Sequence, residues 1–251
     1  MTIHWALLSD LPPLPAVPPP TWLGPAERQR AELLRAEKRR GDWLLGRLAA
    51  KRLVARILAE VVRMDLALDA FDIVADHLGA PVVRLADGGR LPVGVSISHS
   101  DGTAFCAAWA DSGSGLSVGA DLEKIAPRSA AFVLDFFRPA EIEAWEALPA
   151  GPSRDAFATA IWSAKEAVLK ALRLGLTVDT RSVEILLSDE EAAGLPGLPR
   201  PDGGGWKGFA ACCSPLVPGG DRALAGFWHE KDGFVMTVAI AGLSPARSPG
   251  A

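Results

Sequence analysis

The stretch AAKRLVAR at Ala49–Arg56 aligns without a gap with SAKEAVLK at Ser163–Lys170, which lies 114 positions further along the chain. The same spacing pairs VGVSISHS at 93–100 with KGFAACCS at 207–214. Each helical stretch is therefore followed by a strand-like segment at the same distance. Agreement of separate elements at one spacing indicates an internal repeat.

A third pairing extends the repeat toward the N-terminus. A spacing of 115 aligns IHWALL at 3–8 with VGADLE at 118–123, so that strand, long helix and hairpin recur in the same order. We predict an α+β fold of two pseudo-symmetric α/β halves with the active site in the cleft between them. The expected domains are an N-terminal half (1–115), a C-terminal half (116–243) and a flexible tail (244–251).

Local patterns predict the remaining elements. The proline-rich segment after Asp10 is expected to be extended, and 188–205 to be a loop. A helical pattern covers 26–62, with Gly41 or Gly46 as possible interruptions. We also expect strands over 93–110 with a turn at 100–103, helices over 129–148 and 153–173, and strands near 182–187, 207–213, 223–229 and 234–241.

Composition excludes several classes of protein. The chain has 251 residues, of which 49% are hydrophobic, enough for one large domain or two small ones. It contains no apolar run of about 18 uncharged residues, and its N-terminus lacks the features of a signal peptide, so we expect a cytoplasmic protein with no membrane contact. Three cysteines, Cys106, Cys212 and Cys213, fit neither a disulfide framework nor a zinc site.

Charge is unevenly distributed along the chain. The formal net charge is -4, which does not indicate a nucleic-acid partner. Between Glu27 and Arg56, however, ten Lys or Arg residues face four acids, a local charge of +6. Such a run can be a solvated helix face, or a surface for an anionic ligand or an acidic partner.

The segment VGADLEK at 118–124 places two carboxylates in an otherwise apolar strand. Because side chains alternate along a strand, Asp121 and Glu123 project from one face while Ala120 and Leu122 lie on the other. An ordinary solvated strand face gives the same pattern.

The segment IWSAKEAVLKAL at 161–172 has a helical period. Trp162, Glu166 and Lys170 lie four residues apart on one face, and a separate apolar stripe can be buried. A routine ion pair between Glu166 and Lys170 would account for this face without any ligand.

Carboxylates and lysines together indicate a metal and a phosphate. The oxygens of Asp121, Glu123 and Glu166 suit Mg²⁺, which takes a few carboxylates and leaves other positions to water and substrate phosphate. Lys165 and Lys170 can supply positive charge to that phosphate.

The segment SISHS at 96–100 places Ser98 and His99 at the end of a strand. Neighbours in a strand point to opposite faces, and no nucleophile elbow is present, so a serine hydrolase is disfavoured. Both side chains can instead donate hydrogen bonds to phosphate.

These motifs resemble the 4′-phosphopantetheinyl transferases, specifically the longer, pseudo-duplicated Sfp-type. VGADLE is followed some forty residues later by WSAKEAVLK and preceded by SISHS and WLLGRLAAK, and the resemblance extends from about Pro25 to Leu187. It implies transfer of the phosphopantetheine arm of coenzyme A to a serine of an apo acyl or peptidyl carrier protein, which releases adenosine 3′,5′-bisphosphate. It also implies Mg²⁺ as cofactor, with Mn²⁺ possible, and a monomeric enzyme.

The resemblance implies a role for each motif residue. Glu166 and Lys170 would be catalytic. The implied metal ligands are Asp121, Glu123 and Glu166, and the implied coenzyme A contacts are Arg28 (or Arg30), Arg47, Ser98, His99, Lys165 and Lys170.

One departure from the family pattern affects coenzyme A binding. Where the family often has Gly-Lys-Pro, this chain has Gly79-Ala80-Pro81, so Arg84 or Arg90 would have to replace the lysine. A non-catalytic homologue that binds coenzyme A or a carrier protein, and a Mg²⁺-dependent nucleotide phosphohydrolase, are the alternative functions.

Overall fold

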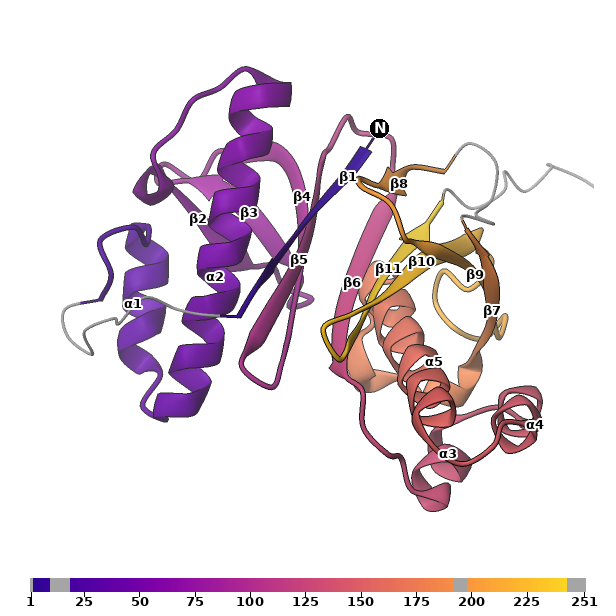
Figure 1. The fold of residues 1–251 in the computed structure, drawn as a ribbon. Coiled ribbons are helices and arrows are strands. Elements are labelled where there is room, and N and C mark those ends of the chain that lie inside the picture. The colour runs from indigo at the N-terminus through magenta and orange to yellow at the C-terminus, as the bar shows by residue number, and fades with distance from the viewer. Residues whose placement is uncertain (1, 10–18, 192–197, 243–251) are drawn as a thin grey trace, which may run out of the picture. The chain divides into compact units, whose positions relative to one another are not determined.

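The computed structural model of the chain describes residues 2–9, 19–191 and 198–242, and these form two compact units (Figure 1). Unit 1 comprises Met1–Ser112 and Pro199–Asp202, and unit 2 comprises Gly113–Leu198 and Gly203–Ala251. The expected tail at 244–251 and most of the proline-rich segment lie outside the described residues.

Unit 1 is a six-stranded sheet packed against one long helix, α2 (Figure 1). The strand order is β2-β3-β4-β5-β1-β8, and only the short β8 pairs in parallel, with β1. The apolar side of α2 packs on the sheet and forms the core of the unit, which is centred on Ala50, Val54 and Ile57. The elements are β1 (Thr2–Leu8), α1 (Pro25–Leu33), α2 (Glu37–Ile57), a π-helical turn η1 (Leu58–Val62), η2 (Leu68–Ala70), β2 (Phe71–Ala75), β3 (Pro81–Leu85), β4 (Arg90–Ser100), β5 (Thr103–Ala110) and β8 (Arg200–Pro201).

Unit 2 is a five-stranded antiparallel sheet in the order β6-β11-β10-β9-β7. Helix α5 lies across it, with its predicted apolar stripe of Ile161, Ala164 and Val168 buried (Figure 1). The elements are β6 (Ser117–Lys124), α3 (Ala130–Phe136), α4 (Pro139–Ala147), α5 (Pro152–Ala171), η3 (Gly175–Thr177), η4 (Thr180–Ser182), β7 (Val183–Glu191), β9 (Lys207–Cys213), β10 (Leu224–Lys231) and β11 (Phe234–Ala241).

The predicted α+β fold with two repeated sheets is confirmed, with one correction to the alignment. Strands β2, β3, β4, β5 and β1 of unit 1 stand in the same order as β7, β9, β10, β11 and β6 of unit 2. The strand KGFAACC, β9, therefore occupies the place of β3, whereas the sequence spacing had paired it with β4. Strands β2 and β3 were not predicted from the sequence. Because β3 was missing, β9 was paired with the next strand of unit 1, β4.

The predicted helix at 26–62 is divided at a different place from the one expected. Both Gly41 and Gly46 lie inside α2, and the break falls at 34–36, where Leu34 takes an extended conformation with φ -85° and ψ 92°. Gly46 remains helical where a Cβ would lie 3.1 Å from Ile97 Cγ2, so it permits close packing of α2 on β4. The predicted turn at 100–103 between two strands is confirmed.

Each unit contains a fully buried lysine that joins a short helix to the first residues of a strand. In unit 1 the Lys51 ammonium contacts the carboxylate of Glu27 and the carbonyl of Phe71. Glu27 also accepts hydrogen bonds from the N–H groups of Gly24 and Ile73, both at 3.1 Å. Helix α1, helix α2 and strand β2 are thereby held at one point.

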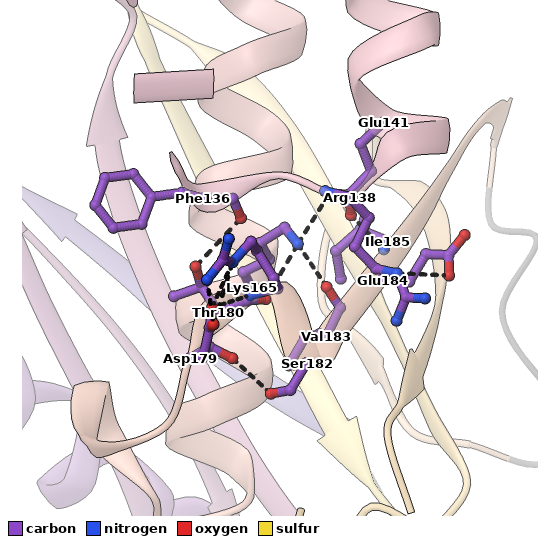
Figure 2. A network of polar contacts seen from close by, with 11 residues as sticks. Phe136, Arg138, Glu141, Lys165, Asp179, Thr180, Ser182, Val183, Glu184 and Ile185 are labelled. Carbon is purple, nitrogen blue, oxygen red and sulfur yellow. Dashed lines mark hydrogen bonds and ion pairs between the residues drawn. The ribbon is translucent and has the colours of Figure 1, made fainter. Parts of the chain in front are cut away.

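Unit 2 repeats this network, with Glu141 and Lys165 lying 114 positions after Glu27 and Lys51, and the strand residues 112 positions after theirs (Figure 2). The Lys165 ammonium lies 2.9 Å from Glu141 and donates to the carbonyl of Val183. Glu141 accepts from the N–H groups of Arg138 at 2.7 Å and Ile185 at 2.8 Å. The two networks correspond residue for residue, which is independent support for the repeat.

Candidate functional site

The candidate site lies in unit 2 where α5 meets β6, and a glycine makes this approach possible. Gly119, Asp121 and Glu123 alternate along one side of β6. A Cβ on Gly119 would lie 2.0 Å from the Ala167 carbonyl oxygen of α5, so only glycine fits there. The helix therefore covers the strand face that carries both carboxylates, and the alternative of a solvated strand face does not apply.

Asp121 is buried, with 1% of its surface exposed, and α5 supplies partners to both of its oxygens. Lys170 donates to Oδ1 at 2.6 Å, and the Ser163 hydroxyl donates to Oδ2 at 2.8 Å. A buried carboxylate remains charged only with such compensation.

Glu123 lies closer to the surface and is held by two side chains. Arg128 donates to it at 2.9 Å, and Trp162 Nε1 donates at 3.2 Å. Burial raises the pKa of the Glu123 carboxyl, the negative charge of Asp121 raises it further, and Arg128 opposes both effects.

Glu166 extends the acidic cluster from the helix side. Burial, together with the negative charges of Asp121 and Glu123, raises the pKa of the Glu166 carboxyl to about 7. Lys170, whose Nζ lies 3.9 Å from Glu166 Oε2, opposes this shift. Asp121 and Glu123 therefore lie close enough to Glu166 for their charges to disfavour its ionised form.

The donor set fits Mg²⁺ in its chemistry. Among the residues that the structure describes, no group of three or more His, Cys, Asp or Glu side chains is arranged to hold a metal ion. Asp121, Glu123 and Glu166 therefore stay a predicted ligand set, and their oxygens are the kind of donor that Mg²⁺ takes together with substrate phosphates and water. Burial is the main cause of the raised pKa of Glu166 and the charge of Asp121 adds to it; a bound cation would relieve the second effect.

Lys165 does not join this cluster, which corrects the sequence-based expectation of a phosphate contact. Its side chain is 0% exposed and lies inside the network with Glu141, Thr180 and Val183 (Figure 2). Burial lowers the pKa of the Lys165 ammonium, and Glu141 opposes that shift. A fully buried, paired ammonium holds elements together and has no open side toward a ligand.

The other predicted contacts lie in unit 1. Arg28 donates from Nε to the Leu23 carbonyl at 2.7 Å, which leaves its terminal nitrogens near the surface. Ser98 is buried on β4, and the adjacent His99 is exposed. The contacts of these side chains with coenzyme A remain predictions.

Arg47, also in unit 1, is a less accessible cation than its sequence indicates. Its side chain is 15% exposed, stacks over the Trp43 ring at 5.1 Å and lies 3.6 Å from Glu27. Burial lowers the pKa of the Arg47 guanidinium, and Glu27 opposes the shift.

Arg84 and Arg90, the two residues proposed to replace the missing lysine, each already have a partner. Arg84 donates to the Gly88 carbonyl at 2.8 Å, and Arg90 lies 3.4 Å from Asp111. Both side chains are exposed enough to be approached by an anion.

Sequence reasoning missed Ser163 and Thr237, which bond to each other beside Asp121 at 2.8 Å. A signal for Ser163 was present, because it lies seven residues before Lys170 and so on the same helix face. Thr237 could be found only from the pairing of β11 with β6, which places it opposite Asp121.

A shallow pocket of about 400 Å³ opens elsewhere in unit 2, beside Arg138 and Arg181. Each guanidinium is already paired, Arg138 with Glu184 at 3.2 Å and Arg181 with Asp179 at 2.8 Å. The pocket contains none of the clustered carboxylates and is separate from the candidate site.

Two sheets, each covered by one long helix, with an acidic cluster under α5, define an α+β protein with a candidate cation site in unit 2. Residues 117–210 of the chain match the model of the 4′-phosphopantetheinyl transferase superfamily. The matched segment includes all three carboxylates and Lys170. The resemblance noted in the sequence is confirmed at this level.

Solved structures and curated proteins add little to this assignment. Thirty-six chains of solved structures match, among them the holo-[acyl-carrier-protein] synthase of Thermotoga maritima, with 17% identity and a TM-score of 0.34. The alignment covers 50% of this chain and 62% of the synthase, so the chain spans less than two thirds of that protein. None of the curated proteins compared is similar enough to count as a match. Among the described residues, no helix is both long and apolar enough to cross a membrane.

Proposed function

We propose that the chain is a 4′-phosphopantetheinyl transferase of the long, pseudo-duplicated Sfp-type. It would transfer the phosphopantetheine arm of coenzyme A to a serine of an apo acyl or peptidyl carrier protein, in the manner of a holo-[acyl-carrier-protein] synthase. The observation that carries the proposal is the buried Asp121 carboxylate, which is held by Lys170 and lies beside Glu166, within the segment that matches the superfamily.

The reaction is a displacement at phosphorus. The serine oxygen of the carrier forms a bond to the phosphorus that carries the pantetheine arm, and the phosphoanhydride bond breaks. The electron pair of that bond leaves with adenosine 3′,5′-bisphosphate, and the serine proton passes to Glu166 directly or through water. Lys170 offsets negative charge on the phosphates as the bond breaks.

Asp121, Glu123 and Glu166 would hold Mg²⁺, which Mn²⁺ could replace. When bound, the cation neutralises charge on the pyrophosphate. The protein contributes the hydrogen bonds that fix Asp121 and Glu123 and the helix face that excludes water from Asp121.

Unit 1 would supply the contacts to the coenzyme A phosphates. Arg28 and His99 are accessible enough to approach the 3′-phosphate, while Ser98 and Arg47 lie deeper in unit 1. We further propose that the protein acts as a cytoplasmic monomer, without a nucleic-acid or membrane partner.

The decisive experiment combines the chain with coenzyme A, Mg²⁺ and an apo carrier protein, followed by mass spectrometry of the carrier. A mass gain of one phosphopantetheine arm supports the proposal. An unmodified carrier indicates a binding homologue, and phosphate release without carrier modification indicates a phosphohydrolase.

Variants connect the activity to the site. Asp121→Asn and Glu166→Gln should each slow transfer by about 100-fold or more, because loss of one charge from the cluster removes about 3 kcal/mol of electrostatic stabilisation. Glu143→Gln, a change at an exposed residue of α4, is the matched control and should leave transfer unchanged. Wild-type turnover by both site variants would refute the assignment of these carboxylates to the active site.

A further inference from the structure

Two buried hydroxyl groups lie beside Asp121 and come from different elements. Thr237 on β11 pairs directly with Asp121 on β6, and Ser163 approaches both from α5. Ser163 and Thr237 are each 0% exposed. The two hydroxyls therefore belong to the interior of unit 2 and have no access to bulk water as an alternative partner.

The hydrogen bonds of this group run toward the carboxylate. Ser163 donates to Asp121 Oδ2 at 2.8 Å, and Thr237 Oγ1 lies 2.8 Å from Ser163 Oγ and 3.0 Å from the Ser163 carbonyl oxygen. Each hydroxyl has one hydrogen. Because the hydrogen of Ser163 is donated to Asp121, the single hydrogen of Thr237 is directed at Ser163, where Oγ and the carbonyl oxygen can share it, and the Asp121 carboxylate is the final acceptor.

This arrangement fixes the carboxylate at both oxygens. Lys170 holds Oδ1 at 2.6 Å while Ser163 holds Oδ2, so rotation of the carboxylate breaks one of two charge-assisted hydrogen bonds. Each carboxylate oxygen can accept more than one contact, so the bonds leave acceptor capacity for a cation. Hydrogen-bond partners of this kind orient metal ligands and tune their affinity.

We propose that Ser163 and Thr237 are positioning residues, which orient the Asp121 carboxylate for Mg²⁺. The inference rests on the proposed function, because that function supplies the reason for a cation at this place. Neither hydroxyl touches a reacting atom. Their effect passes through Asp121, with Thr237 acting through Ser163.

Thr159 provides a matched control on the same helix. It is also a buried hydroxyl of α5, one turn before Ser163, but it donates to the Asp155 carbonyl at 2.8 Å, within its own helix. Thr159→Val therefore removes a buried hydroxyl from α5 without removing a donor toward Asp121.

The test is a calorimetric titration of the full chain with Mg²⁺ alone, accompanied by thermal unfolding and the carrier assay. Ser163→Ala and Thr237→Val should each lower the Mg²⁺ affinity by about 10- to 100-fold, the usual effect of losing such a partner. Thr237→Ser keeps the hydroxyl and should restore affinity close to wild type, and Thr159→Val should not change it. If Ser163→Ala fails to fold, the comparison of Thr237→Val with Thr237→Ser still decides.

The outcomes separate this inference from the proposed function. Equal Mg²⁺ affinity in Thr237→Val and Thr237→Ser would overturn the positioning role, as would a wild-type chain that binds no Mg²⁺. If the wild type binds Mg²⁺, the variants weaken it as expected, and no carrier is modified, the positioning role stands and the transferase proposal fails.

Discussion

Replacing Glu166 by Gln should stabilise the metal-free chain at pH 8. The Glu166 side chain is 18% exposed, and burial together with Asp121 raises its pKa from 4.5 to about 7. An acid whose pKa is higher in the folded chain favours folding while protonated. As pH rises above 4.5, the unfolded chain releases this proton and the folded chain retains it, so stability falls until about pH 7 and the loss is then complete.

The magnitude follows from the two pKa values. The difference between 4.5 and about 7 corresponds to roughly 3 kcal/mol of unfolding free energy, at 1.36 kcal/mol for each pH unit. Part of the repulsion is shared with Asp121 and Glu123, whose charges remain in the variant. We therefore expect Glu166→Gln to gain about 1–3 kcal/mol at pH 8 and much less at pH 5.

Urea unfolding in the presence of a chelator, at pH 5 and pH 8, measures this difference. The exposed Glu143→Gln is the control and should match wild type at both pH values. Added Mg²⁺ should reduce the advantage of Glu166→Gln at pH 8, because the cation relieves the repulsion in the wild type. A variant less stable than wild type at pH 8, or an advantage independent of pH, would refute the reasoning.

Three further outcomes can be measured. Gly119→Ala should lower the free energy of unfolding in urea by about 1–3 kcal/mol, because the new Cβ would lie 2.0 Å from a carbonyl oxygen of α5. Gly41→Ala, whose Cβ would have no atom within 4 Å, should raise the free energy of unfolding by about 0.5–1 kcal/mol. Arg28→Ala should weaken coenzyme A by roughly 1.5–3 kcal/mol in calorimetry and affect dephospho-coenzyme A less; equal losses would place this residue away from the 3′-phosphate. Charge reversal at the exposed Arg35 and Arg39 should raise the Michaelis constant for the carrier and flatten its dependence on salt, with the coenzyme A constant little changed. Unchanged carrier kinetics at low salt would identify the basic run as a solvated helix face.

The helical part of the site could be predicted from the sequence because its period is local. Trp162 and Lys170 lie on one face of α5 and meet Glu123 and Asp121, as a four-residue spacing requires. The buried stripe of the same helix was also readable. Helix periodicity needs no knowledge of the rest of the chain.

Burial depends on contacts between distant segments, and here the sequence was insufficient. The residues next to Asp121 in the sequence do not reveal that α5 covers this side chain. The close approach of α5 becomes apparent only in the structure, where Gly119 leaves space for the helix. Lys165 next to Glu166 reads as a second phosphate ligand, yet it points into the interior toward Glu141, a residue 24 positions away in the chain. Adjacent residues on a helix point about 100° apart, so Lys165 can point into the interior while Glu166 points toward the site.

The buried lysine is present in both units, but the acidic cluster is present in one. At the positions of unit 1 that correspond to Asp121, Glu123 and Glu166, the chain carries Ala6, Leu8 and Arg52. Unit 1 therefore shares the repeated fold and the buried lysine network of unit 2 but lacks its acidic groups. Substitution of Lys51 or Lys165 should destabilise the unit that contains it. Substitutions at Ala6, Leu8 and Arg52 should not affect the proposed metal site.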